Sequence, residues 1–269
     1  MTADDQTYAF DNALAVQRER LDMLETLFDP GTIRHLEALG VQPGWRCLEV
    51  GAGGGSIAAW MCDRVGPDGR VLATDLDTRW VDQLARPNLE TRVHDLLEDD
   101  LPQGEFDLVH VRLVLGWLLP DPEAGLERLI AAVKPGGWLL AEEIDFVSAV
   151  PDARTDADAA ALFERVVDAH NAVLAERHAF DPFYGRRVPG ALKDAGLVDT
   201  GSEGRAWMWR GGGPGGRIWQ LTIEQLRDAI VELGLMDAAD VDAAVALCAD
   251  PRLRTMSPVV MAAWGRRPT

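Results

Sequence analysis

The chain has 269 residues and a formal net charge of −18 at pH 7, with 44 Asp or Glu residues against 26 Lys or Arg residues. This excess of acid argues against nucleic acids and anionic membranes as partners and favours a small or neutral ligand. The apolar runs are far shorter than a membrane span and the first residues show no signal-peptide pattern, so the expected compartment is the cytoplasm.

The first forty residues are predicted to be helical. Apolar residues at helical spacing indicate one helix that reaches Phe28, and Asp29-Pro30-Gly31 is expected to break it before a second helix from Thr32 to Leu39. Segment 1–43 is therefore predicted to be a helical element that precedes the first strand.

A strand that turns through glycines into a helix follows. The apolar run that begins at Cys47 contains Glu49 and opens into Gly51, Gly53 and Gly55, after which Ser56–Met61 has a helical pattern. Such a loop lets a ligand approach bare backbone at the positive end of a helix, which indicates a nucleotide-like cofactor. Ser56 stands where a dinucleotide-binding fingerprint needs glycine, and no Gly-Lys-Ser/Thr phosphate loop occurs.

Further strands are predicted at regular spacing. The second, 70–75, ends at Asp75, whose carboxylate is placed to accept ribose hydroxyls in a doubly wound sheet. The third, 89–94, is followed by Asp95, and the fourth is 106–112. A helix with an apolar stripe then leads to Lys134-Pro135-Gly136-Gly137 and a fifth strand.

These five blocks, in this order over residues 45–145, resemble the class I S-adenosylmethionine-dependent methyltransferases. The similarity is to bacterial small-molecule enzymes of ubiquinone/menaquinone and natural-product biosynthesis. It implies an α/β fold with a Rossmann-like, seven-stranded, mostly parallel sheet and helices on both faces. It also implies S-adenosylmethionine (SAM) as cofactor, S-adenosylhomocysteine (SAH) as product, no metal, and a small-molecule acceptor.

The resemblance also implies a set of cofactor-binding residues. In this family the acid after the third strand holds the exocyclic amine of adenine, and the N–H of its neighbour meets a ring nitrogen. Carried over to the matching positions, the implied residues are Glu49, Gly51, Ala52, Gly53, Gly55, Asp75, Leu76, Asp95, Leu96 and Arg112. The Arg112 side chain could instead pair with nearby carboxylates.

The second half of the chain is expected to continue the α/β pattern. Helices are predicted over 155–178 and 188–195, and a strand near 203–209. The glycine run 211–216 is expected to be irregular and to supply hinge freedom, and the capping-box pattern Thr222–Gln225 to begin a helix. A further helix, through Val241 and Cys248, is predicted to stop at Pro251, before a last strand at 258–265.

The sheet of the family normally ends in a hairpin, so the long separation of the last two predicted strands implies a helical insertion over 211–250. The predicted division is an N-terminal lid, 1–43, and a SAM-binding domain, 44–269, in which the insertion caps the acceptor side. Packing of the N-terminal helices on the sheet, an inert embellishment and a homodimer contact are the alternatives. Cys47, Cys62 and Cys248 lack metal-ligand spacing and are predicted to be inert buried thiols.

Methyl transfer mainly requires that the acceptor be held in line and stripped of water, and a histidine near neutral pKa is suited to remove a proton. The candidates are His178, in a polar-aromatic loop, and His110, at the tip of the fourth strand, where a core or cofactor-shaping role is an equal alternative. Three acids crowd the end of the fifth strand: Glu142, Glu143 and Asp145. One of them is a candidate to orient the acceptor, and at least two are expected to be solvated. Three tryptophans are predicted to form either core or an aromatic wall of the acceptor pocket: Trp207, Trp209 and Trp219.

The predicted function is methyl transfer from SAM to an O, N or C atom of a small molecule. Two alternatives stay open on the sequence alone. One is an enzyme of the same fold that binds SAM but catalyses cyclisation or decarboxylation, and the other is a non-catalytic homologue.

Overall fold

The computed structural model describes residues 15–177 and 180–269. The chain folds into two compact units. The sheet unit comprises Phe28–Asp145, Phe183–Arg205 and Val260–Thr269; the helical unit comprises Phe146–Pro182, Ala206–Val259 and the described residues before Phe28. Each unit is thus built from three separate stretches of the chain.

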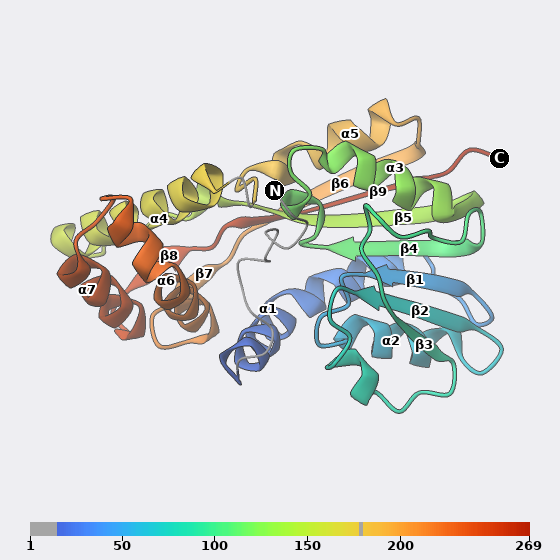
Figure 1. Ribbon diagram of the computed structural model, residues 1–269, viewed down its shortest axis with the longest axis horizontal. Helices are drawn as coiled ribbons and strands as arrows, with labels where there is room; N and C mark the ends of the chain where they lie inside the picture. The colour runs from blue at the N-terminus through green and yellow to red at the C-terminus, as the bar shows by residue number, and fades with distance from the viewer. Residues whose placement is uncertain (1–14, 178–179) are drawn as a thin grey trace. The chain divides into compact units, whose positions relative to one another are not determined.

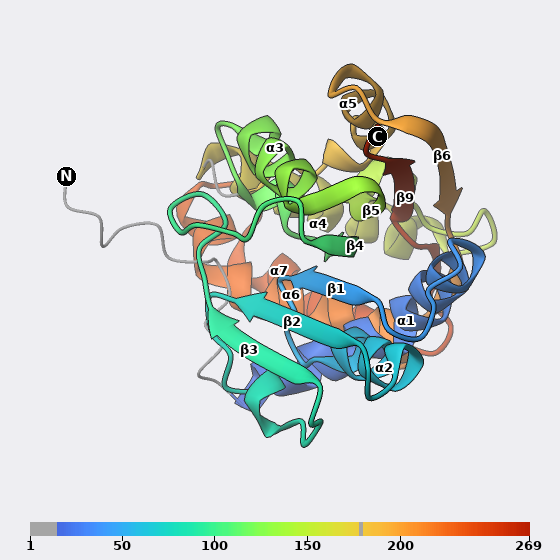
Figure 2. The ribbon, with the colours of Figure 1, turned by 90° about the vertical axis from the view of Figure 1, so that its right-hand side faces the viewer.

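The sheet unit contains a seven-stranded sheet in the order β3-β2-β1-β4-β5-β9-β6 (Figures 1 and 2). Neighbouring strands from β3 to β5 pair in parallel, whereas β9 and β6 are antiparallel. This confirms the predicted Rossmann-like, mostly parallel sheet. The strands are β1 Arg46–Val50, β2 Arg70–Asp75, β3 Leu89–Val93, β4 Phe106–Arg112, β5 Val133–Asp145, β6 Val198–Arg205 and β9 Val259–Arg266.

Helices cover both faces of this sheet (Figure 2). Helix α2 (Ser56–Val65) and the second half of α1 (Ala15–Ala38) pack on one face, where Cys47 and Leu108 are buried. Helices α3 (Pro122–Ala132) and α5 (Val188–Asp194) pack on the other, against Leu48 and Val109. Because side chains alternate along a strand, the central strands are apolar on both faces, as parallel strands are.

Helix α1 corrects the prediction of two N-terminal helices, because it continues through Pro30. Proline lacks the N–H that would bond to the carbonyl of Thr26, but both residues are exposed, so water can replace the missing donor. The following turn is held by its side chains. Asp29 pairs with Arg112, and Thr32 donates a hydrogen bond to a buried carboxylate of β5.

The helical unit packs α4 (Ala157–Glu176), α6 (Pro214–Glu232) and α7 (Ala238–Ala249) together, with a short antiparallel pair, β7 (Met208–Arg210) and β8 (Arg254–Met256). Helices α6 and α7 lie between β6 and β9 in sequence, which confirms a helical insertion between the last two strands of the sheet. Across 15–177 and 180–269, none of the helices combines the length and apolar character needed to cross a bilayer. The lid role of segment 1–43 and the cap role of 211–250 stay predictions, and residues 1–14 lie outside the described part.

The glycine run is not the irregular hinge that the sequence suggested. Helix α6 begins at Pro214, so that Gly215 and Gly216 are helical. A Cβ on Gly215 would lie 2.2 Å from the ring of Trp209, and one on Gly216 would lie 2.5 Å from the carbonyl oxygen of Cys248. These glycines therefore allow close packing of α6 on its neighbours and do not supply freedom.

The predicted capping box is also wrong, because Thr222 lies inside α6. Its hydroxyl donates to the carbonyl of Ile218, 2.8 Å away, and accepts from the guanidinium of Arg20 at 2.7 Å. The buried Arg20 also donates to Gln225, so the residues of the expected cap instead fix α1 to α6 inside the helical unit.

The three cysteines are free and buried, as predicted. Burial raises the pKa of the Cys248 thiol to about 12, and burial is also the largest cause that raises the pKa of Cys62 to about 11. Both side chains are therefore neutral thiols near neutral pH, and neither is an activated nucleophile.

Candidate active site

The loop between β1 and α2 is shaped by backbone bonds and left-handed glycines. The N–H groups of Gly51 and Ala52 both donate to the carbonyl of Thr74, at 2.8 and 3.0 Å, which joins the loop to the end of β2. Gly51, Gly53 and Gly55 have φ values of 72°, 53° and 84°. Side chains rarely adopt this backbone conformation, so the glycines are required by the shape of the loop.

Asp75, at the tip of β2, is bonded to that loop. One carboxylate oxygen accepts the N–H of Gly53 at 2.8 Å, and the other accepts the N–H of Asp77 at 3.1 Å. Burial raises the pKa of Asp75, and these N–H donors offset the effect only in part. Each oxygen keeps a second lone pair, so the carboxylate can also accept hydroxyl donors. Beside it, Leu76 is 58% exposed and offers an apolar surface.

The residues after β3 lie next to Asp75. The N–H of His94 donates to the carbonyl of Asp75 at 2.9 Å, so the tips of β2 and β3 are adjacent. The Asp95 carboxylate accepts the N–H of Leu97 at 2.8 Å, while Leu96 is buried. The structure thus brings the predicted ribose and adenine residues to one edge of the sheet.

Glu49 lies at the same edge of the sheet, and the partners of its carboxylate show whether the residues fit the cofactor. Its side chain lies at the carboxyl end of β1 and is only 4% exposed. One oxygen lies 3.7 Å from Nδ1 of His110, and the other, Oε2, is buried without a hydrogen-bond partner among residues 15–177 and 180–269. A buried carboxylate oxygen without a donor is costly, so a cationic group of a ligand is the partner that this position calls for. The residues therefore fit a ligand such as SAM.

Arg112 makes the ion pair that the sequence offered as its alternative role. Its guanidinium donates to Asp29 at 2.8 Å and to the hydroxyl of Thr32 at 2.9 Å. Both partners lie on α1, so Arg112 fastens the second half of this helix to the end of β4. Its side chain is committed to the protein, and a contact of its backbone with the cofactor stays a prediction.

The three acids at the end of β5 are buried, so the expectation that at least two of them are solvated was wrong. Glu143 is fully buried and accepts the N–H groups of Val114 and Leu115 at 3.0 and 2.8 Å. Asp145 is buried and makes a bidentate pair with Arg186 at 2.5 and 2.7 Å. Both acids shape the loops around the sheet edge and are not placed to orient an acceptor.

Glu142 is the centre of a network that the sequence did not reveal. It is 2% exposed and bonds to Thr32, to Nδ1 of His35 at 3.2 Å and to Nε2 of His110 at 3.3 Å. His110 is fully buried. This favours the cofactor-shaping role over direct contact with an acceptor. The other catalytic candidate, His178, lies outside the described residues.

Trp209 and Trp219 are both buried in the helical unit. Trp209 packs against Gly215, where a Cβ would lie 2.2 Å from its ring. Trp219 of α6 contacts the rings of His170, Phe163 and Phe146, with centroid distances of 5.3, 5.6 and 5.9 Å. Both side chains belong to the core of this unit, and an aromatic acceptor wall stays a prediction.

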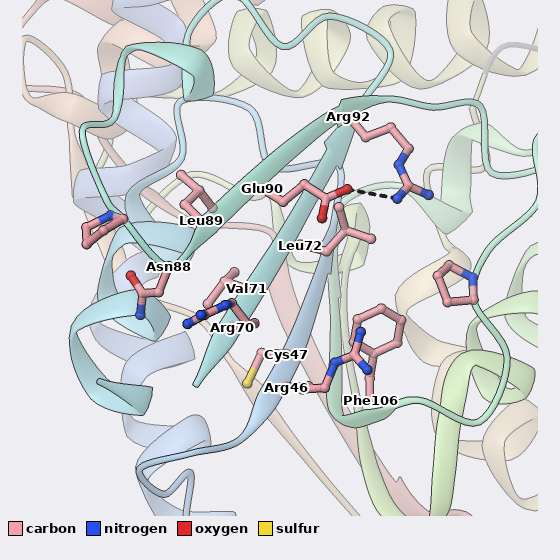
Figure 3. A pocket seen from close by; sticks show the side chains of 12 residues that line it. Arg46, Cys47, Arg70, Val71, Leu72, Asn88, Leu89, Glu90, Arg92 and Phe106 are labelled. Atoms are coloured by element: carbon pink, nitrogen blue, oxygen red, sulfur yellow. Dashed lines mark hydrogen bonds and ion pairs between the residues drawn. The ribbon is translucent and has the colours of Figure 1, made fainter. Parts of the chain in front are cut away.

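A cavity of about 370 Å³ lies at the opposite edge of the sheet (Figure 3). Arg46 and Arg92 point into it, but Arg46 pairs with Glu105 at 2.8 Å and Arg92 with Glu90 at 2.9 Å. Ligands of open α/β sheets bind at the carboxyl ends of the strands, and this cavity is at the amino ends of β1 and β2. It is therefore not the candidate site.

Comparison with known proteins gives the same family. A family model described as "Methyltransferase domain" matches residues 9–200. Methyltransferase str3 of Strobilurus tenacellus is 33% identical over 57% of this chain and 53% of its own length. The ubiquinone/menaquinone biosynthesis C-methyltransferase UbiE of Laribacter hongkongensis is 29% identical over 48% of this chain and 57% of its own length. The chain thus spans little more than half the length of each of these relatives.

Solved structures agree on the fold. Phosphoethanolamine N-methyltransferase 2 of Haemonchus contortus, in complex with SAM, superposes with a TM-score of 0.56 at 17% identity, covering 93% of this chain and 57% of that one. The YcgJ protein of Bacillus subtilis gives 0.54 at 11% identity, covering 88% and 97%. At these identities the likeness concerns the fold alone.

Proposed function

The chain belongs to the methyltransferase domain family, and on this premise we propose that it transfers a methyl group from SAM to an O, N or C atom of a small molecule. The observation that carries the proposal is the hydrogen bond between the N–H of Gly53, in the glycine loop, and the Asp75 carboxylate. It is supported by the buried oxygen of Glu49, on the neighbouring strand β1, that has no partner among the described residues. When bound, SAM supplies an electrophilic methyl group on a sulfonium, which a positioned nucleophile displaces in line.

Different residues of the chain would bind different parts of the cofactor. The Asp75 carboxylate accepts the ribose hydroxyls, and Leu76 packs against the base. Asp95 and the N–H of Leu96 meet the polar edge of the adenine, and Glu49 accepts the ammonium of the methionine end. The Arg112 side chain keeps α1 against the sheet, which helps to exclude water from this edge.

The direct test is transfer of a label. The protein is incubated with SAM labelled in its methyl group and with phenols, quinols, amines and carboxylic acids as acceptors. We expect the label to appear in an acceptor together with one equivalent of SAH. An acceptor that is cyclised or decarboxylated without uptake of label would instead identify the other chemistry of this fold.

Replacement of Asp75 by Ala is expected to weaken SAH binding by roughly 1–3 kcal/mol, because the ribose hydroxyls lose a buried acceptor. The loop also loses its bond to the N–H of Gly53. Asp77→Ala is the matched control, since Asp77 is two residues away and pairs with Arg79 at 2.7 Å. Isothermal titration calorimetry measures both variants. Unchanged affinity for Asp75→Ala and weakened affinity for Asp77→Ala would move the ribose contact to Asp77.

A further inference from the structure

Three ionisable side chains are stacked at the carboxyl ends of β1, β4 and β5. Glu49 and His110 are register partners in the parallel β1–β4 pair, so their side chains leave the sheet on the same face. Glu142 reaches His110 from β5. The imidazole therefore lies between two carboxylates, with Nδ1 3.7 Å from Glu49 and Nε2 3.3 Å from Glu142. All three residues are buried.

The two carboxylates differ in how many of their oxygens have a hydrogen-bond partner. Both oxygens of Glu142 are used, by the hydroxyl of Thr32 and by the rings of His35 and His110. Burial acts to raise the pKa of Glu142, but these bonds outweigh it and hold the pKa well below the usual range. Within the described part of the chain, Glu49 keeps one buried oxygen without a partner.

The other charges around His110 do not satisfy Glu49. On β4 itself, the guanidinium of Arg112 is directed to Asp29 of α1 at 2.8 Å. On α1, His35 is directed to Glu142, and its Nε2 lies 3.5 Å from Glu203 of β6. His110 is thus the titratable group placed to act on the Glu49 carboxylate.

We propose that His110, anchored by Glu142, is a positioning residue that holds the Glu49 carboxylate so that its free oxygen receives the ammonium of the cofactor's methionine end, and that the proton on His110 tunes the affinity. This inference rests on the proposed function. It assigns to α1 a share in cofactor binding, because Thr32 and His35 of that helix orient Glu142.

The sign of the pH dependence follows from the charges. Burial acts to lower the pKa of His110, but the hydrogen bond to Glu142 and the nearby carboxylate of Glu49 outweigh it and raise the pKa. An imidazolium partly cancels the charge of Glu49, and a ligand ammonium brings a second positive charge to the same carboxylate. Binding therefore favours loss of the His110 proton. Affinity for an ammonium ligand should rise with pH through the His110 pKa, for as long as the ligand amine stays protonated.

Two ligands separate this role from a merely structural one. SAH carries the amino-acid end, whereas 5′-methylthioadenosine has the same nucleoside and thioether without it. For the wild type, calorimetry in two buffers of different ionisation enthalpy should detect proton release with SAH and none with 5′-methylthioadenosine. Equal release for the two ligands, or none with SAH, overturns the inference without any variant.

The variant His110→Gln keeps a donor for Glu142 and removes both the titration and the group that faces Glu49. We expect SAH to bind roughly tenfold more weakly than it binds the wild type above the His110 pKa, because Glu49 loses the group that orients it, and without the pH dependence of the wild type. Affinity for 5′-methylthioadenosine should stay within about twofold of the wild type, since that ligand does not reach Glu49. Glu49→Gln should give the same pattern, since it removes the charge at nearly constant shape.

If His110→Gln lost affinity for both ligands to the same extent, His110 would only support the fold. That result would overturn this inference and leave the proposed function standing. Binding of neither ligand to the wild type would overturn the proposed function as well. The inference concerns binding, so a lack of methyl transfer to any acceptor, with the ligand pattern as expected, would leave it supported and would count against the proposed reaction.

Discussion

Gly53→Val should abolish cofactor binding while the protein stays folded. Gly53 has φ of 53°, and its N–H is bonded to Asp75, so a branched side chain would distort the loop where backbone and ligand must meet. Calorimetry with SAH should show no heat of binding at concentrations that saturate the wild type. Far-UV circular dichroism should show the wild-type helix and strand content.

The control is Gly40→Val. Gly40 has φ of 78°, and apart from its chain neighbours no described residue lies within 4 Å of the place that a Cβ would take. The variant therefore bears similar backbone strain, on the order of 1–2 kcal/mol, away from the loop. It should lose stability but keep its affinity for SAH. A folded Gly53→Val protein with wild-type affinity would show that the β1–α2 loop does not cradle the cofactor.

Gly216→Ala should destabilise the helical unit even though it replaces glycine by a better helix former. The new Cβ would lie 2.5 Å from the carbonyl oxygen of Cys248 and 2.9 Å from that of Arg210. Both contacts are with backbone, so α6 must move away from its neighbours, at a cost of roughly 1–3 kcal/mol. Chemical unfolding followed by tryptophan fluorescence measures the loss, because Trp209 and Trp219 report from this unit.

Gly190→Ala is the matched helical substitution. Gly190 lies in α5, is exposed, and has nothing within 4 Å of a Cβ, so alanine should stabilise by up to about 1 kcal/mol. If both variants were stabilised, α6 would tolerate a side chain at residue 216, and the close packing inferred for this helix would be wrong.

The strand tips were predictable because each is a local pattern. Glycines after an apolar run, and an acid at the end of the next strand, have one physical explanation in a parallel sheet, and Gly53 and Asp75 are indeed bonded to each other. The fold followed from the same blocks, since alternating strands and helices leave few topologies.

Helix α1 shows what a local pattern misses. Pro30 was expected to end a helix, and no local signal marks the polar residues of α1 as buried. Yet Arg20, Thr32 and His35 are buried, because their partners come from α6 and β5, far along the chain. The periodicity of a sequence shows which positions are polar, but it does not show a hydrogen-bond partner that comes from a distant part of the chain. The prediction for the glycines of α6 was wrong for the same reason, since the groups that crowd Gly216 include the carbonyl of Cys248.

The strand order has a consequence for synthesis on the ribosome. Strand β6 lies at the edge of the sheet and pairs with β9, which is made after α6 and α7. A nascent chain that has reached Arg205 therefore has an unpaired β6, and the last stretch of the helical unit, 206–259, has not yet been made. The last residue of the helical unit, Val259, is also the first residue of β9, so this unit is complete in sequence while the sheet unit still lacks 260–269. The sheet must wait for the rest of β9, and until then the open edge of β5 is exposed to chaperones and to other nascent chains.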